Sequence, residues 1–208
     1  MEGRRNPFVA QEGIPFLLLA AVATGLALRY LDFVFTLSFG LLFVALYLLF
    51  RDPRRAVPSV PLGIVSPVDG TIASVDTIET GVFPGKMHRI RIEIDSFGTY
   101  TARAPVEGKI LDLHGLAADT SSNYERNALW LQTDEGDDIV LQFIGYRLGL
   151  APRAFVQYGD RVGQGQRCIY LRLTRYAEVH VPISSTVQVE PGQTIVAGSD
   201  LIGKLLHA

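Results

Sequence analysis

The sequence predicts a mainly β protein in which an antiparallel β domain follows an N-terminal transmembrane helical hairpin. Three features of the 208 residues predict it. The first fifty residues are largely apolar, residues 51–63 are basic and proline-rich, and short Val- and Ile-rich runs alternate with Gly, Pro and Asp from Ile64 onward. We therefore expect a membrane hairpin over residues 1–50, a linker over 51–63 and a β domain over 64–208.

Two uncharged apolar runs predict the helices of the hairpin, one at about residues 14–28 and one at 33–50. At 1.5 Å per residue the second nearly crosses a hydrocarbon core of about 30 Å, whereas the first is short. Arg29 and Asp32 separate the runs and can pair across a turn. A single interrupted helix that crosses once is the alternative, and it would put the β domain on the side opposite the N-terminus.

Arginines flank both outer ends of the apolar region, at Arg4 and Arg5 before it and at Arg51, Arg54 and Arg55 after it. The positive-inside rule then predicts a cell-membrane protein whose soluble domain lies on the cytoplasmic side. We expect the second group of arginines to lie at the membrane surface, near anionic phospholipid headgroups. The net charge of −2, without a further basic patch, argues against nucleic acid as a partner.

The β domain is expected to contain eight main strands, and helical periodicity is weak apart from residues 146–157. The single cysteine, Cys168, lies in an apolar strand and is expected to be a buried thiol. The expected strands span residues 70–75, 88–94, 108–113, 128–132, 138–144, 167–173, 178–182 and 200–206.

Two internal similarities refine this fold. Residues 66–72 (SPVDGTI) and 104–110 (APVEGKI) share a Pro, an acidic residue and a Gly before a strand. Residues 156–166 and 187–198 each place glycine turns, which require positive φ, on both sides of a short strand. Such paired elements resemble the barrel-sandwich domains of biotinyl and lipoyl carriers. A carrier displays a lysine at a hairpin tip, and the turns here contain no convincing Met-Lys or Asp-Lys element, so the carrier function is not indicated.

In their order along the chain, six motifs resemble the phosphatidylserine decarboxylase family in its short, membrane-anchored form. The resemblance covers nearly the whole chain. The motifs are residues 50–53 with Arg54 and Arg55, residues 65–67 with Asp69 and Gly70, residues 103–106 with Gly108, residues 124–127, Gln142 with Gly145, and residues 159–167.

The resemblance implies a self-processing lyase of phospholipid biosynthesis. In that family a Gly-Ser bond breaks by serinolysis, and the serine becomes an N-terminal pyruvoyl group. This cofactor forms a Schiff base with phosphatidylserine and accepts the electrons released as CO₂ leaves, so that phosphatidylethanolamine is formed. An Asp and a His are thought to activate the serine.

The catalytic positions implied by the resemblance are only partly matched. Asp69 retains the acidic position, but Tyr100 stands in place of His. Thr174 and Arg175 stand in place of Gly-Ser. We therefore expect no pyruvoyl cofactor in this chain, unless Thr174 attacks the preceding carbonyl or the pair at residues 198–199 is cleaved.

The resemblance also implies that Arg103, Arg126 and Asn127 brace the site or bind a phosphate or carboxylate of the substrate. Without the resemblance, Glu125 and Arg126 are expected to be exposed turn charges, and Asn127 to begin a strand. His180 is expected to be a surface or core histidine rather than a base. No histidine has metal-ligand spacing, so no metal is expected.

Together these features predict a decarboxylase-related membrane protein that does not process itself, a pseudoenzyme that binds phospholipid headgroups, including phosphatidylserine, or a membrane partner. The partner would be a second copy of the chain or an active paralogue. The alternative is an active, pyruvoyl-dependent phosphatidylserine decarboxylase with an unusual cleavage site. A third possibility is a structural partner that makes no headgroup contact.

Overall fold

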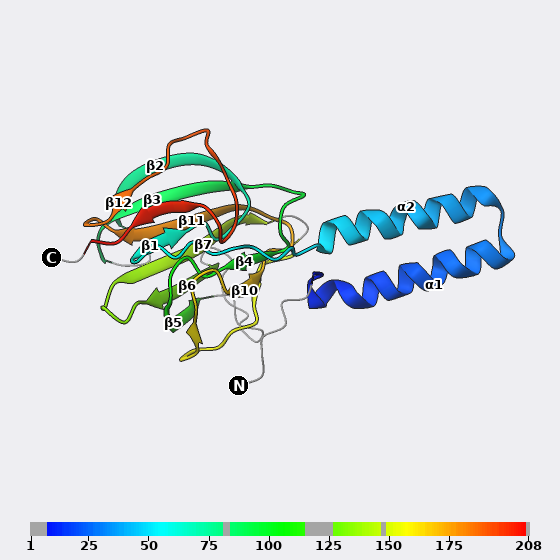
Figure 1. Ribbon diagram of the computed structural model, residues 1–208, viewed down its shortest axis with the longest axis horizontal. Helices are drawn as coiled ribbons and strands as arrows, with labels where there is room; N and C mark the ends of the chain where they lie inside the picture. Colours follow the sequence, from blue (N-terminus) through cyan, green and yellow to red (C-terminus); the bar gives the residue numbers. More distant parts are fainter. Residues whose placement is uncertain (1–7, 81–83, 115–126, 147–148, 207–208) are drawn as a thin grey trace. The chain divides into compact units, whose positions relative to one another are not determined.

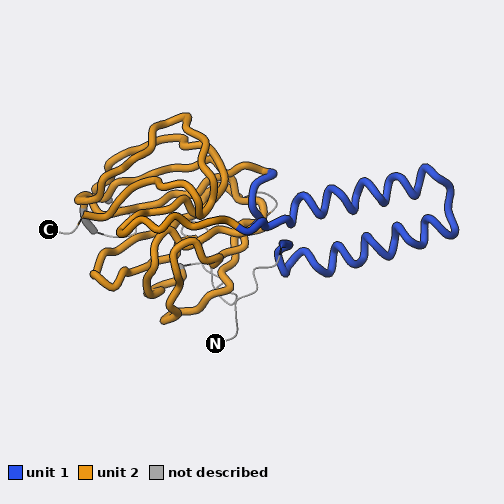
Figure 2. The backbone as a smooth tube through the Cα atoms, viewed as in Figure 1, with its two compact units in different colours: residues 1–54, 97–100 blue, residues 55–96, 101–208 orange. Residues whose placement is uncertain are grey.

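The computed structural model describes residues 8–80, 84–114, 127–146 and 149–206 (Figure 1). The chain forms two compact units (Figure 2). The first contains residues up to Arg54 together with Phe97–Tyr100, and the second contains Arg55–Ser96 and Thr101–Ala208.

The first unit contains an antiparallel pair of apolar helices (Figure 1). A 3₁₀ turn at Gln11–Gly13 leads into α1 (Ile14–Tyr30), and α2 spans Phe33–Phe50. Both helices are long and apolar enough to cross a membrane. Helix α1 extends two residues beyond the predicted end at residue 28. Most large side chains of both helices are exposed, whereas Ala20 and Ala27 are buried, so small residues allow the helices to approach each other.

The second unit is an all-antiparallel β structure in three sheets. The orders are β1-β14-β12, β4-β10-β8 and β13-β2-β3-β11-β7-β6-β5-β9. The strands are β1 Gly63–Val65, β2 Gly70–Thr80, β3 Pro84–Ile94, β4 Thr101–Arg103, β5 Gly108–His114, β6 Asn127–Gln132, β7 Asp138–Tyr146, β8 Arg153–Ala154, β9 Arg161–Val162, β10 Arg167–Tyr170, β11 Thr174–Pro182, β12 Thr186–Val187, β13 Thr194–Ile195 and β14 Leu201–Lys204.

All eight predicted strands are present, so the fold class is confirmed. The short strands β9 and β13 are those expected between the paired glycine turns. The short strands β1, β4, β8 and β12 were not expected, because two or three residues carry too little alternation to be recognised. The possible helix at residues 146–157 is wrong over its described part. There the chain forms a turn at Gly149, with positive φ, and then enters β8. The unexpected glycine conformation ends any helical run at this point.

Strand alternation separates a dry inner face from a polar outer face of the eight-stranded sheet. On β3, Ile90 and Ile92 are fully buried in the core. Arg89 and Arg91 alternate with them and point to the other face, next to Glu178 of β11. Period-two alternation therefore places three charged side chains on one surface.

The first internal similarity has a structural counterpart. Gly70 and Gly108 each begin a long strand, and each lies against a carbonyl oxygen of the neighbouring strand. A Cβ at Gly70 would lie 2.1 Å from the oxygen of Glu93, and one at Gly108 would lie 2.3 Å from that of Gln132. Only glycine allows these two approaches.

The second internal similarity, between residues 156–166 and 187–198, also has a structural counterpart in the backbone angles of its glycines. Gly159 and Gly192 have φ of +86° and +88°, and Gly165 and Gly198 have φ of +70° and +69°. The short strands between them, β9 and β13, pair with the starts of β5 and β2 respectively. The β domain therefore consists of two related halves, each joining a Pro-x-acid-Gly turn to a pair of glycine turns.

Candidate functional site

Asp69 lies in the first Pro-x-acid-Gly turn and is largely buried. Its Oδ1 accepts a hydrogen bond from the backbone N–H of Ala197 at 2.7 Å. Its Oδ2 accepts one from Nη2 of Arg55 at 2.9 Å. The retained acidic position is thus engaged by the β domain itself and by an arginine predicted to lie at the membrane surface.

Arg103 lies near the same turn. Its side chain is 2% exposed, and Nη1 donates to the carbonyl oxygen of Gly165 at 3.0 Å. A Cβ at Gly198 would lie 2.8 Å from Cδ of Arg103, so the aliphatic stem packs on the last glycine turn. The structure thus gathers Asp69, Arg55 and Arg103 around residues 197–198, a grouping that sequence spacing did not show.

Tyr100, which was predicted to stand at the position of the family's His, belongs to the first unit. Its hydroxyl donates to Oε2 of Glu12 at 3.1 Å, and its ring centroid lies 4.8 Å from that of Phe50. The backbone N–H of Tyr100 also bonds to the carbonyl oxygen of Arg51. These contacts attach the tyrosine to the base of the hairpin.

Thr174 closes a tight turn that begins at Leu171. Its N–H and its hydroxyl both donate to the Leu171 carbonyl oxygen, at 3.2 and 2.5 Å. Arg172 inside the turn has a φ of +53°, a left-handed conformation that is rare for a side chain of this kind. The hydroxyl that would have to attack the Leu173 carbonyl is therefore already engaged as a donor.

Arg175, which was predicted to occupy the position of the family's serine, is exposed. Its guanidinium lies over the ring of Tyr176, 5.0 Å from the centroid, and forms an ion pair with Glu93 across β11 and β3. A guanidinium has no nucleophilic oxygen and stays protonated.

The remaining predicted substrate residues differ in what can be described. Arg126 lies outside the described residues. Asn127 begins β6, is 4% exposed, and its Nδ2 has no hydrogen-bond partner within the part of the chain that the structure describes. Arg51 and Arg54 are exposed at the end of α2.

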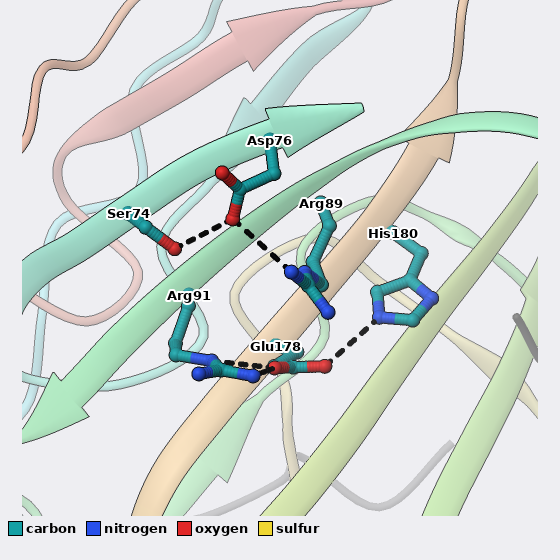
Figure 3. Close-up of polar contacts among 6 residues, drawn as sticks. All are labelled: Ser74, Asp76, Arg89, Arg91, Glu178 and His180. Carbon is teal, nitrogen blue, oxygen red and sulfur yellow. Dashed lines mark hydrogen bonds and ion pairs between the residues drawn. The ribbon is translucent and has the colours of Figure 1, made fainter. Parts of the chain in front are cut away.

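A second buried polar group lies on the outer face of β3 and β11 (Figure 3). Oε1 of Glu178 lies 2.6 Å from both Nε and Nη2 of Arg91, and Oε2 lies 3.3 Å from Nε2 of His180. Because a carboxylate only accepts, Nε2 of His180 carries the proton in this contact. His180 is 2% exposed, in agreement with the prediction of a surface or core histidine.

The electrostatics of this group follow from its contacts. Burial raises the pKa of the Glu178 carboxyl, but hydrogen bonds from His180 and Arg91 outweigh it and hold that pKa below its ordinary value. At the exposed edge of the same face, hydrogen bonds from Ser74 and Arg89 lower the pKa of Asp76. Sequence reasoning missed this row of charged side chains, which crosses β2, β3 and β11. Its only signal was that polar and charged residues occupy alternate positions of these strands, as Arg89 and Arg91 do.

Cys168 and one cavity are further candidate features of the β domain. Cys168 is fully buried, as predicted, and burial raises its pKa to about 12, so it is not a nucleophile at neutral pH. The cavity, of about 330 Å³, is lined by Leu62, Val106, Glu107, Asp134 and Gln164 among others. Within the described ranges, no group of three or more His, Cys, Asp or Glu residues is placed to hold a metal ion.

Comparison with known proteins gives the same family as the motifs. Residues 43–203 match the phosphatidylserine decarboxylase family. The chain is 29% identical to a phosphatidylserine decarboxylase proenzyme of Burkholderia ambifaria, over 96% of this chain and 97% of the relative. It is 27% identical to the corresponding proenzyme of Nitrosomonas europaea, over 96% of each chain.

Among solved structures, the chain is similar to the glucose permease IIA of Mycoplasma capricolum. The TM-score is 0.47 and the identity 19%, over 68% of this chain and 94% of that one. The family match and the two relatives aligned over nearly their full length show that the chain belongs to the phosphatidylserine decarboxylase family.

Proposed function

We propose that this protein is a membrane-anchored member of the decarboxylase family that does not process itself and that binds phospholipid headgroups. One observation supports the first part: Thr174-Arg175, which the motif resemblance aligns with the family's self-cleaving Gly-Ser, contains no serine, and the threonine hydroxyl donates a hydrogen bond to the Leu171 carbonyl oxygen. Without a freed serine there is no precursor of a pyruvoyl group.

The surroundings of the other two catalytic positions support the same proposal. The Tyr100 hydroxyl donates a hydrogen bond to Glu12. A phenol keeps its proton at neutral pH in water and is therefore a poor general base. Asp69 accepts from Arg55 and from the Ala197 N–H. In this arrangement the carboxylate stabilises the turn at 197–198.

Self-processing is tested on the purified full-length chain by intact-mass spectrometry. A single species of 22.8 kDa is expected. Two chains, the smaller beginning with an α-keto acyl group derived from Thr174 or from Ser199, would overturn the proposal and establish the active decarboxylase instead. In that case phosphatidylserine would also be converted to phosphatidylethanolamine by the same preparation.

A matched variant locates the cause. Restoring all three positions (Tyr100→His, Thr174→Gly and Arg175→Ser) gives the family's catalytic set on this scaffold. Cleavage in the triple variant, and none in the double variant that keeps Tyr100, would assign the loss to these positions. Cleavage in the wild type would contradict the proposal whatever the variants do.

Headgroup binding is supported by the exposed Arg51 and Arg54 at the end of an apolar helix, since clustered cations beside a membrane segment attract anionic lipids. Native mass spectrometry of the detergent-purified chain is expected to detect retained phosphatidylserine or phosphatidylglycerol. The retained lipid should fall in the Arg51→Gln/Arg54→Gln variant and stay in Arg161→Gln, which removes an exposed charge of the β domain. Equal retention in both variants would favour a purely structural role.

A further inference from the structure

The open end of the hairpin, where α1 begins and α2 ends, carries a group of aromatic and arginine side chains. The guanidinium of Arg54 lies 5.0 Å from the ring centroid of Phe8, and Phe8 is 61% exposed. Phe16 and Phe50 stack with centroids 5.8 Å apart, and Phe16 is 54% exposed. Several rings at this end therefore face the surroundings rather than a protein core.

The segment between β3 and β4 joins this group. Tyr100 contacts Glu12 and Phe50, as described above, so the segment at residues 97–100 is held at the base of the helices. Phe97, the first residue of the segment, is 71% exposed. A single exposed ring is common on a protein surface, but Phe97 belongs to the same unit as the exposed rings of Phe8 and Phe16. Exposed apolar side chains that gather in this way are typical of membrane or protein interaction sites.

The opposite end of the hairpin has the same chemistry. The guanidinium of Arg29 lies 5.3 Å from the ring centroid of Tyr30, and Tyr30 and Phe33 are 73% and 77% exposed. An arginine stacked on an aromatic ring thus stands at each end of the helix pair. Such pairs suit the membrane–water interface, where the ring meets apolar chains and the guanidinium meets phosphate.

The distance between the two ends fits a bilayer. Helix α2 has 18 residues and no charge, so its length is about 27 Å, close to a hydrocarbon thickness of about 30 Å. Phe16 is itself a residue of α1, and most large apolar side chains of α1 and α2 are exposed as well. This shared exposure, together with the arginines, favours a phospholipid bilayer over a protein as the phase that covers them.

We infer that Phe97 and Phe8 insert their rings into the headgroup layer of the same bilayer that the hairpin crosses, with the Arg54–Phe8 stack at one interface and the Arg29–Tyr30 stack at the other. The segment at residues 97–100 is then a membrane-contacting element of the chain, in addition to the two helices. This inference rests on the proposed membrane anchoring.

Single-cysteine variants of the full-length chain test the depth of each position. The native Cys168 is fully buried and remains unlabelled, so no background substitution is required. Phe97→Cys, Leu41→Cys and Tyr158→Cys are labelled with a nitroxide and reconstituted into phosphatidylcholine–phosphatidylglycerol vesicles. Leu41 lies at the middle of α2 and is 62% exposed, and Tyr158 is a 74% exposed position of the β domain. The measurement is the ratio of spin relaxation caused by oxygen, which enriches in lipid, to that caused by a water-soluble nickel chelate.

The expected order of this ratio is Leu41 highest, Phe97 intermediate and Tyr158 lowest. A Phe97 ratio equal to that of Tyr158, with Leu41 still lipid-like, would overturn the inference while leaving the membrane hairpin intact. A Leu41 ratio equal to that of Tyr158 would overturn the membrane anchoring itself. A second measurement, quenching of an environment-sensitive dye on the same cysteines by brominated lipids, must give the same order.

Discussion

Two turns of the β domain, at residues 66–72 and 104–110, share one sequence pattern and equivalent places in the two halves. In each, the glycine lies against a carbonyl oxygen and begins a long strand. Their acidic side chains differ: Asp69 is largely buried and paired with Arg55, whereas Glu107 is exposed and lines the cavity of about 330 Å³.

The difference separates two roles that one motif combines. The Pro and Gly determine the path of the backbone, and they do so in both copies. The acidic residue acts only where the surrounding structure supplies partners for it, and Arg55 and the Ala197 N–H supply them for Asp69. Retention of the motif therefore shows the fold, and it does not by itself show catalysis.

The largest expected loss of stability comes from replacing the glycine of either Pro-x-acid-Gly turn, and it should be similar in both turns. Gly70→Ala and Gly108→Ala each place a Cβ 2.1 or 2.3 Å from a backbone oxygen that cannot move without displacing a strand. Each is expected to lower the free energy of unfolding by about 3 kcal/mol. Urea unfolding of the detergent-purified chain measures it. Gly163→Ala, whose Cβ would meet only a side-chain oxygen at 3.9 Å, is the control and should be nearly neutral.

The next largest effect is expected to differ between the two turns, because only one of their acidic residues is buried. Asp69→Ala leaves the buried Ala197 N–H without its acceptor and is expected to cost about 1–3 kcal/mol. Glu107→Ala removes an exposed carboxylate and should change stability by less than about 0.5 kcal/mol. The same unfolding measurement compares them. Equal costs would show that the two acidic residues have the same role and would remove the contrast.

A smaller, symmetric effect is expected at the glycine turns. Gly159 and Gly192 have nearly the same positive φ, and a methyl group added at either would meet open space, so alanine would suffer only backbone strain. Each substitution should cost about 1 kcal/mol. Thermal unfolding measures the stability cost of each substitution. If the two costs differ by more than about a factor of two, the two halves do not share this turn.

The smallest expected effect is the difference in acid sensitivity that Glu178, a buried carboxylate outside either copy, gives the chain. Its folded-state pKa lies below the ordinary value of 4.5, so its contribution is present above that pH and is lost as the pH falls through the folded pKa. Stability of the wild type should thus decline more steeply than that of Glu178→Gln below about pH 4.5. Glu190→Gln, which removes an exposed carboxylate outside this group of charged residues, is the control for general acid effects. Parallel declines in wild type and Glu178→Gln would contradict this assignment.

Much of the fold was predictable because its signals are local. Uninterrupted apolar runs predicted both helices, and alternation of Val and Ile with polar residues predicted the eight longer strands. The site was less predictable. Asp69 was recognised by its motif, but its partner Arg55 was expected at the membrane surface, and Tyr100 gave no sign of its contacts with Glu12 and Phe50.

The sequence by itself determined the family, the two apolar helices and the absence of Gly-Ser at residues 174–175, because each depends on residue type and order along the chain. Only the tertiary structure decided which side chains meet: Arg55 with Asp69 across 14 positions, and Arg91 with Glu178 across 87. The physical reason is that hydrogen bonds and ion pairs act over a few ångströms, and strand register, rather than spacing in the sequence, brings these groups within that distance.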